Sequence, residues 1–169
     1  MASKVPTASR INWAAFALQL GVLAALIFLF GSMGAEPMAG AVVYLIWSWG
    51  MRLALPREHR RGVALIKAGR FAEAIPHCEA SAEWFKRHAW VDKNRAIVML
   101  SPSGWSYREM ALANRAFSLA QAGRGQEAMN AYEAMLVEFP GSVLATTPLA
   151  MMRAAQCGVQ QKESSSNAS

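Results

Sequence analysis

The sequence predicts an all-α protein in which a hairpin of two apolar helices precedes a short stack of amphipathic helical hairpins. Two long runs of apolar residues fill most of the first 55 positions. After them, apolar residues recur with the i, i+3, i+4 spacing that places them on one face of a helix. The segment LIKAGRFAEAI at 65–75 also returns as LAQAGRGQEAM at 119–129, which indicates a duplicated structural unit.

The two apolar runs have the length and composition of transmembrane helices. The first, residues 11–30, holds 20 residues without a charge, and at about 1.5 Å of rise per residue it matches a hydrocarbon core of about 30 Å. The second, residues 39–55, is shorter and follows the turn GSMGAEPM. A secretory signal peptide is the alternative. However, the apolar region of a signal peptide usually spans about 7–15 residues, whereas the first run here has 20 residues and a second apolar run follows it. We therefore expect a transmembrane hairpin over residues 11–55.

Basic residues flank this hairpin on both sides, and the chain carries a formal net charge of +6. The turn between the runs has Glu36 but no Lys or Arg. By the positive-inside rule, these charges predict a multi-pass protein of the bacterial inner membrane, with residues 1–10 and the C-terminal domain in the cytoplasm. The arginines could alternatively bind lipid headgroups or nucleic acid. We expect the lipid bilayer and no nucleic acid, because no aromatic residues alternate with them. The flanking basic residues are Lys4, Arg10, Arg52, Arg57, Arg60 and Arg61.

Residues 56–157 form a second region, in which each unit consists of a helix, a glycine turn and another helix. Gly69 and Gly123 lie where the chain must turn, since glycine adopts a left-handed conformation at little cost. A helical hairpin of this size cannot bury its apolar face alone, so we expect the two units to stack. The helical patterns cover residues 57–68 and 71–85 in the first unit, and 107–122 and 126–139 in the second.

This pattern resembles the tetratricopeptide repeat (TPR), which has small residues in both helices, glycine at the turn and a closing proline. The matching residues are Gly62, Gly69, Ala74, Ala116, Gly123, Ala128, Tyr132 and Pro140. The units depart from the repeat where Cys78 and Gly125 replace aromatic residues and where Lys86 replaces proline. They lie 54 residues apart, compared with about 34 in a TPR, so roughly 20 residues, 87–106, are inserted. The resemblance implies a short solenoid of about two repeats.

The segments around the units complete the expected architecture. Within the insertion, Asp92 is expected to begin a short helix as its N-cap, and Ser106 with Glu109 to form a capping box for the next helix. Residues 141–158 are expected to form a helix that caps the last repeat, and the polar residues 158–169 a disordered tail. Three tryptophans bracket the insertion and either fill the core or contact a partner: Trp84, Trp90 and Trp105.

The residue pattern predicts no enzyme and neither a cofactor nor a metal. His77 and Cys78 are adjacent, so on a helix their side chains point about 100° apart and do not readily chelate one ion. His88 and Cys157 add no recognisable spacing of metal ligands. Two cysteines without a CxxC motif favour reduced thiols. The alternative hypothesis is a small membrane enzyme or cofactor-carrying accessory subunit that uses His77, Cys78 and His88.

By analogy with TPR proteins, the first helix of each unit lines a concave face that binds a protein or peptide. The residues implied on this face are Val63, Ile66, Lys67, Ala113, Asn114, Phe117 and Gln121. Val63 and Phe117 stand where a TPR domain that clamps a C-terminal carboxylate has Asn, so an apolar helix or strand is the expected ligand. We therefore predict a membrane-anchored, non-enzymatic interaction or assembly (scaffold) subunit, bound to a membrane-protein complex or to further copies of itself.

Overall fold

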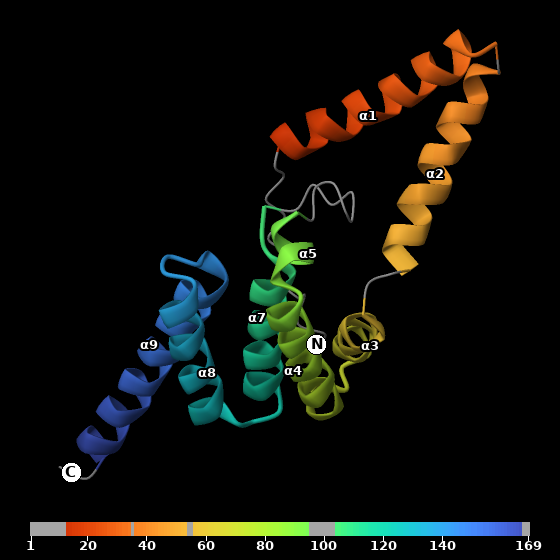
Figure 1. The fold of residues 1–169 in the computed structure, drawn as a ribbon. Helices are drawn as coiled ribbons and strands as arrows, with labels where there is room; N and C mark the ends of the chain where they lie inside the picture. Colours follow the sequence, from red (N-terminus) through yellow and green to blue (C-terminus); the bar gives the residue numbers. More distant parts are fainter. Residues whose placement is uncertain (1–12, 35, 54–55, 95–103, 167–169) are drawn as a thin grey trace.

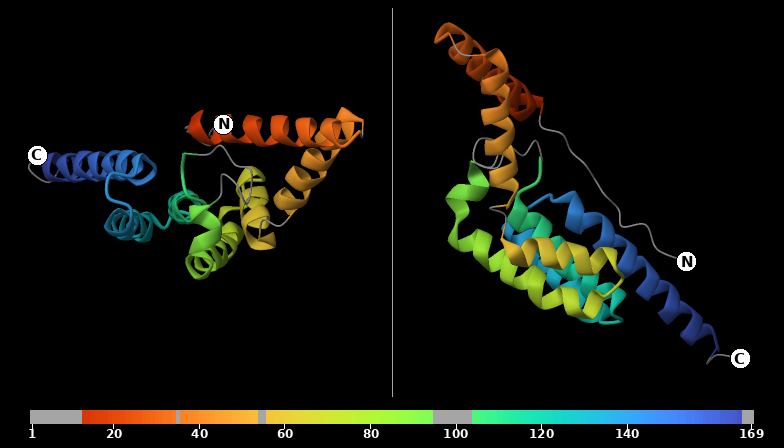
Figure 2. Two further views of the ribbon diagram at one scale, coloured as in Figure 1. Left: turned by 45° about the horizontal axis from the view of Figure 1, so that its top comes forward. Right: turned by 90° about the vertical axis from the view of Figure 1, so that its right-hand side faces the viewer.

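The computed structural model describes residues 13–34, 36–53, 56–94 and 104–166, and these residues form helices and turns without a β-strand. The all-α prediction is confirmed for this part of the chain. Five helices, α3, α4, α7, α8 and α9, lie side by side in a row, and α1 and α2 form a separate hairpin beyond one end of it (Figures 1 and 2). The helices are α1 (Trp13–Ser32), α2 (Pro37–Leu53), α3 (Arg57–Lys67), α4 (Phe71–Arg87), α5 (Ala89–Lys93), α7 (Tyr107–Gln121), α8 (Gly125–Glu138) and α9 (Val143–Ser166).

Helices α1 and α2 pack against each other as a hairpin. At their contact, a Cβ added to Gly40 would lie 2.6 Å from the carbonyl oxygen of Leu26, so the close approach of the two backbones requires glycine. Gln19 of α1 is buried, and its Nε2 has no hydrogen-bond partner among the described residues. Both helices begin and end two residues away from the expected bounds, and residues 11–12 and 54–55 lie outside the described residues.

A helix that crosses a bilayer must be both long and apolar, and no helix within the described residues meets these two requirements. Helix α2 has 17 residues and rises about 26 Å, less than the roughly 30 Å of hydrocarbon that a membrane span has to cross. The expectation of two transmembrane helices is therefore wrong. The predicted multi-pass localisation in a bacterial inner membrane, with both termini in the cytoplasm, depends on these spans and is wrong as well.

Both predicted glycine turns are confirmed. Gly69 joins α3 to α4 with φ of 74°, and Gly123 joins α7 to α8 with φ of 79°. In each turn the N–H of the following arginine donates to the carbonyl of a leucine in the preceding helix: Arg70 to Leu65 and Arg124 to Leu119, both at 2.9 Å. These bonds satisfy carbonyl groups that the end of a helix would otherwise leave unpaired.

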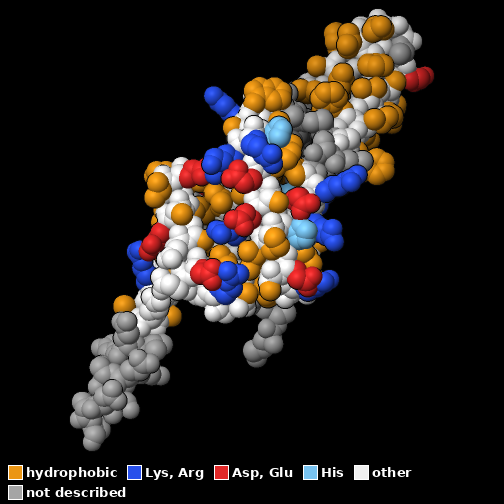
Figure 3. All heavy atoms as spheres, turned by 60° about the horizontal axis from the view of Figure 1, so that its bottom comes forward, with side chains coloured by type: hydrophobic (Ala, Val, Ile, Leu, Met, Phe, Trp, Pro, Cys, Tyr) orange, Lys and Arg blue, Asp and Glu red, His pale blue; other side chains and the backbone are white. Residues whose placement is uncertain are grey.

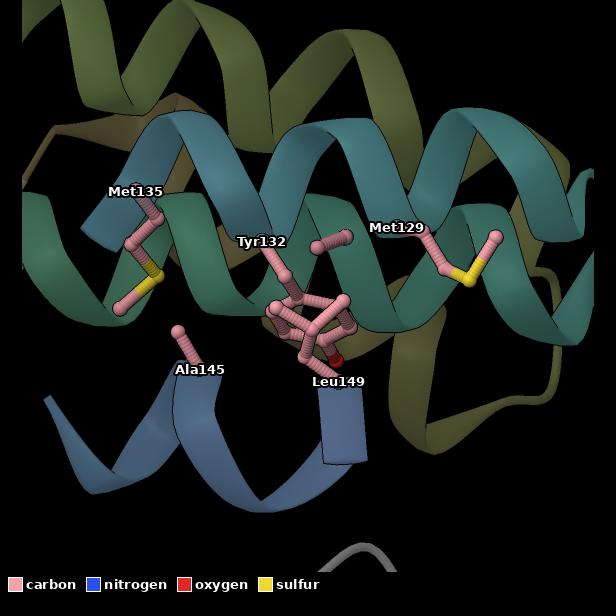
Figure 4. Close-up of a cluster of buried hydrophobic side chains, with 6 residues drawn as sticks. Met129, Tyr132, Met135, Ala145 and Leu149 are labelled. Carbon is pink, nitrogen blue, oxygen red and sulfur yellow. The ribbon is translucent and has the colours of Figure 1, made fainter. Parts of the chain in front are cut away.

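The stack is held by buried side chains that pass from one helix to the next. One cluster joins α3 to α4, and a second joins α4 to α7 and α8 through Ile75, Leu119 and Ala128. The third cluster joins α7 and α8 to α9, where Tyr132 packs against Leu149 (Figure 4). Helix α9 therefore covers the last hairpin, as the capping prediction required. It also continues to Ser166, into the stretch that was expected to be disordered.

The insertion contributes a cap to a neighbouring helix. Asp92 lies inside the short helix α5 and does not begin one, so its predicted role as N-cap of its own helix is wrong. Its carboxylate instead accepts the backbone N–H groups of Tyr107 at 2.7 Å and Arg108 at 3.1 Å, at the start of α7. Ser106 is the N-cap of α7 as predicted, and its Oγ accepts the N–H of Glu109 at 2.9 Å. Residues 95–103 of the insertion lie outside the described residues.

The other half of the capping box is not formed. The carboxylate of Glu109 is buried and accepts a hydrogen bond from Ser142 Oγ at 2.5 Å, across to the turn before α9. This contact ties the start of α7 to the start of α9, and it replaces the expected contact of Glu109 with the N-cap residue.

Candidate functional site

The residues predicted on the concave face of the first unit divide between core and surface. Ile66 is only 5% exposed and packs with Ala74 and Cys78 between α3 and α4. Val63 is half-buried, whereas Lys67 is exposed at the end of α3. Of these three positions, Ile66 is therefore part of the core, and Lys67 is the most accessible to a partner.

The second unit contributes residues to two different sides of α7. Phe117 packs on the cluster that contains Ile66, and its ring lies edge-to-face with Phe71, with 5.8 Å between ring centroids. Ala113 packs on the cluster around Tyr132, toward α8 and α9. Asn114 is half-buried and Gln121 is exposed. The fold thus brings Phe117 and Ile66 together, and it directs Ala113 elsewhere.

The helical residues of the repeat signature are packing residues. Ala74, Ala116 and Ala128 are fully buried, and burial raises the pKa of the Tyr132 hydroxyl to about 12. Gly62 allows α4 to approach α3, because a Cβ there would lie 3.1 Å from the Sγ of Cys78. Pro140 is exposed in the turn after α8. Small residues at helix crossings bring the helices close together, which is the role that the sequence predicted for the shared alanines.

The three residues of the alternative enzyme or cofactor hypothesis do not form one site. His77 Nδ1 lies 2.5 Å from Glu58 Oε2, on the contact between α3 and α4. Cys78 is buried, and desolvation raises the pKa of its thiol to about 11, which opposes formation of a reactive thiolate. His88 stacks on Trp84, with ring centroids 4.1 Å apart, and its Nδ1 donates to the Trp84 carbonyl oxygen at 2.8 Å.

No three His, Cys, Asp or Glu side chains within the described ranges are arranged to hold a metal ion. The tryptophans around the insertion also separate. Trp84 is half-buried against Phe85 and Trp105 is also half-buried, so both fit the core-filling alternative, whereas Trp90 is exposed.

A buried polar contact that the sequence analysis did not identify joins α3 to α4 and α7. The Nδ1 of His59 lies 2.9 Å from Ser81 Oγ, and its ring meets those of Phe85 and Tyr107 edge-on, with centroids 5.8 and 5.4 Å away. Burial lowers the pKa of His59 to about 4, although the nearby charge of Asp92 acts in the opposite direction. His59 and Ser81 lie 22 residues apart in the chain, and no spacing rule pairs residues at that separation.

Beside this contact, Arg108 links three helices. Its guanidinium donates to both carboxylate oxygens of Glu138 on α8, and Nη1 donates to the Ala82 carbonyl oxygen of α4 at 2.7 Å. The hydrogen bonds to Arg108 lower the pKa of Glu138. These polar contacts fix the positions of α4, α7 and α8 at one end of the stack, so their role is to hold the fold together.

The α1–α2 hairpin has an apolar surface, which we define by its exposed side chains. They include Trp13, Phe16, Phe28, Leu29, Met33, Met38, Leu45, Ile46, Trp47 and Trp49. In Figure 3, hydrophobic side chains cover the hairpin, whereas charged side chains are spread over the helical stack. A contiguous apolar surface of this kind is typical of an interaction site.

Comparisons of the chain with protein-family models, with curated proteins and with solved structures found no match. The resemblance to the TPR therefore stays a prediction. The fold shows an all-α, helical-repeat-like stack that is preceded in the chain by an apolar helical hairpin.

Proposed function

We propose that this chain is a non-enzymatic protein-interaction or assembly subunit whose α1–α2 hairpin binds a partner protein. The observation that carries the proposal is the exposed apolar surface of the hairpin. Trp49, for example, is 71% exposed, and large aromatic and aliphatic side chains surround it on the same helix. Desolvation of such side chains is a main source of binding free energy, and aromatic residues are enriched at the centres of interfaces.

The helical stack supports the same role. Its turns, buried alanines and ion pairs hold the five helices of the row in a fixed arrangement, which suits a platform. The half-buried Val63 and Phe117, with exposed Lys67 and Gln121, offer a second surface on α3 and α7 for a peptide. Its ligand is not determined by the fold, because one helical-repeat arrangement serves many partners.

Co-purification of the tagged full chain, followed by mass spectrometry and light-scattering measurement of mass, tests the proposal. Ile46 and Trp49 lie three residues apart on α2, so they share one face, and both are exposed. We expect the double substitution Ile46→Gln with Trp49→Gln to remove the partner. The control is Val137→Gln on α8, which replaces an apolar residue that is 84% exposed and should retain the partner.

Recovery of the wild-type chain alone and monomeric would contradict the proposal. So would a partner that is retained equally by the hairpin variant and the Val137 control. Association of the hairpin with lipid or detergent, and with no protein, would also remove it.

A further inference from the structure

The outer face of α3 carries arginines that have no acidic partner among the residues that the structure describes. Arg57, Arg60 and Arg61 are all exposed, and none of them forms an ion pair with another described residue. Elsewhere in the stack, Arg108, Arg115, Arg124 and Arg153 each pair with a glutamate. The one glutamate of α3, Glu58, contacts His77 on the inner side. In Figure 3, Lys and Arg side chains lie along the edge of the stack that adjoins the hairpin.

The second unit shows how the corresponding face is covered. Ala111 and Ser118 of α7 are 1% and 0% exposed, and α4 packs along α7. Arg115, on the same face, pairs across this contact with Glu79 of α4 at 3.5 Å. The ring contact of Phe71 with Phe117 and the stacking of Phe85 on Tyr107 show that α4 runs antiparallel to α7.

The same positions of α3 are uncovered. With the offset of 54 residues between the units, Arg57, Arg61 and Ala64 correspond to the covered residues of α7, and all three are exposed. Arg61 is thus the counterpart of Arg115, but without its glutamate. Helix α3 is the first of the row, and α4 and α7 are the described helices with which it has its main contacts.

We propose that this face of α3 binds an acidic amphipathic helix of a partner protein, which lies against α3 as α4 lies against α7. The charges specify the occupant, because a helix with glutamates at i and i+4 would face Arg61 and Arg57 as Glu79 faces Arg115. A second copy of this chain fits poorly. The free end of its stack is α9 (Val143–Ser166), whose sequence has Arg153 and Lys162 but a single acidic residue, Glu163.

This inference rests on the proposed interaction role, but it concerns a surface separate from the hairpin. The two can fail separately. If the hairpin variant loses its partner but the α3 face binds no acidic helix, the proposed function stands and only this inference is overturned.

A peptide that copies α4, residues 71–87 with Cys78→Ala to prevent oxidation, serves as the probe. It carries Glu79 and Glu83 at the required spacing. Binding of the labelled peptide to the full chain is measured by fluorescence anisotropy. We expect the double substitution Arg57→Gln with Arg61→Gln to weaken binding roughly fivefold, as the loss of two exposed ion pairs predicts. The control Arg87→Gln removes an exposed, unpaired arginine of α4 and should leave binding unchanged.

Four further measurements decide the outcome. A peptide with Glu79→Gln and Glu83→Gln should bind to the wild-type chain as weakly as the unchanged peptide binds to the arginine variant. Added salt should weaken only the binding of the unchanged peptide to the wild-type chain. Equal binding of the two peptides, or no binding at all, overturns the inference. Binding that depends on Arg115 in place of Arg61 would mean that the peptide displaces α4, which also overturns it. Arginine-dependent sedimentation with phosphatidylserine vesicles, without peptide binding, would assign the face to lipid.

Discussion

The two helical hairpins of the stack, α3–α4 and α7–α8, have the same turn but different interiors. In each turn a glycine has positive φ and the following arginine holds a glutamate three residues later with two hydrogen bonds. These two arginines, Arg70 and Arg124, form the same ion pair twice, with Glu73 and Glu127, at the beginning of the return helix.

The interiors differ at positions separated by the same 54 residues. Where the first hairpin has the buried polar pair His59 and Ser81, the second has the apolar Ala113 and Met135. Where the first has Cys78, the second has Tyr132. The turns are alike because they depend on a few neighbouring residues. The interiors differ because each hairpin packs on different helices, α4 under α7 in one case and α8 under α9 in the other.

The largest difference between the hairpins should appear at the Cys78 and Tyr132 positions. Tyr132→Ala removes a buried ring that contacts α9, and we expect it to lower the free energy of unfolding by about 3–5 kcal/mol. Cys78→Ala removes one sulfur atom from a tight contact and should cost only about 1 kcal/mol. Urea unfolding of both variants measures this. Equal losses of unfolding free energy would contradict the prediction, because they would show that the two positions contribute equally to stability.

His59 should make stability depend on pH. Burial lowers its pKa to about 4 from the usual value of about 6.5, so the folded state favours the neutral ring. This stabilisation is complete above about pH 6.5 and is lost as the pH falls toward 4, by about 3 kcal/mol in total. The variant His59→Ala copies Ala113 of the second hairpin, and its unfolding free energy should vary less with pH over this window. A wild type that is equally stable at pH 7 and pH 4.5 would contradict the prediction.

The glycine turns should respond equally. Gly69 and Gly123 have nearly the same positive φ, and no atom lies within 4 Å of an added Cβ at either position. Substitution by alanine therefore tests backbone strain alone, and each should lose about 1–2 kcal/mol. Thermal or chemical unfolding of Gly69→Ala and Gly123→Ala provides the measurement. A difference above about 1 kcal/mol between them would show that the turns are not equivalent.

The arginine–glutamate pairs should give the smallest effect. Both pairs are fully exposed, so Arg70→Gln and Arg124→Gln should hardly change the unfolding midpoint. The hydrogen bonds from arginine do lower the pKa of Glu73 and Glu127, and each substitution should return the pKa of its glutamate toward the usual value. Carbon NMR titration of the two carboxylates detects this change. An unchanged pKa in either variant would mean that the pair does not persist in solution.

The expected interaction face was only partly recoverable from the sequence. The i, i+3, i+4 pattern identifies which residues of α3 share a face, but it does not say what lies opposite. Ile66 is therefore in the core and Lys67 is exposed, although they are adjacent in the chain. The membrane prediction was wrong because a span must be both long and apolar, and no helix among the described residues meets both requirements; α2, for example, has 17 residues.

The sequence by itself determined the helices, the two glycine turns and the Ser106 cap, because these depend on residues within about four positions of one another. Only the tertiary structure decided that Asp92 caps α7, that His59 meets Ser81, and that α4 covers one face of α7 while the matching face of α3 stays open. Such contacts join residues that are distant in the chain. Their burial and charge balance depend on which helix lies opposite, and the spacing of residues within one helix does not contain that information.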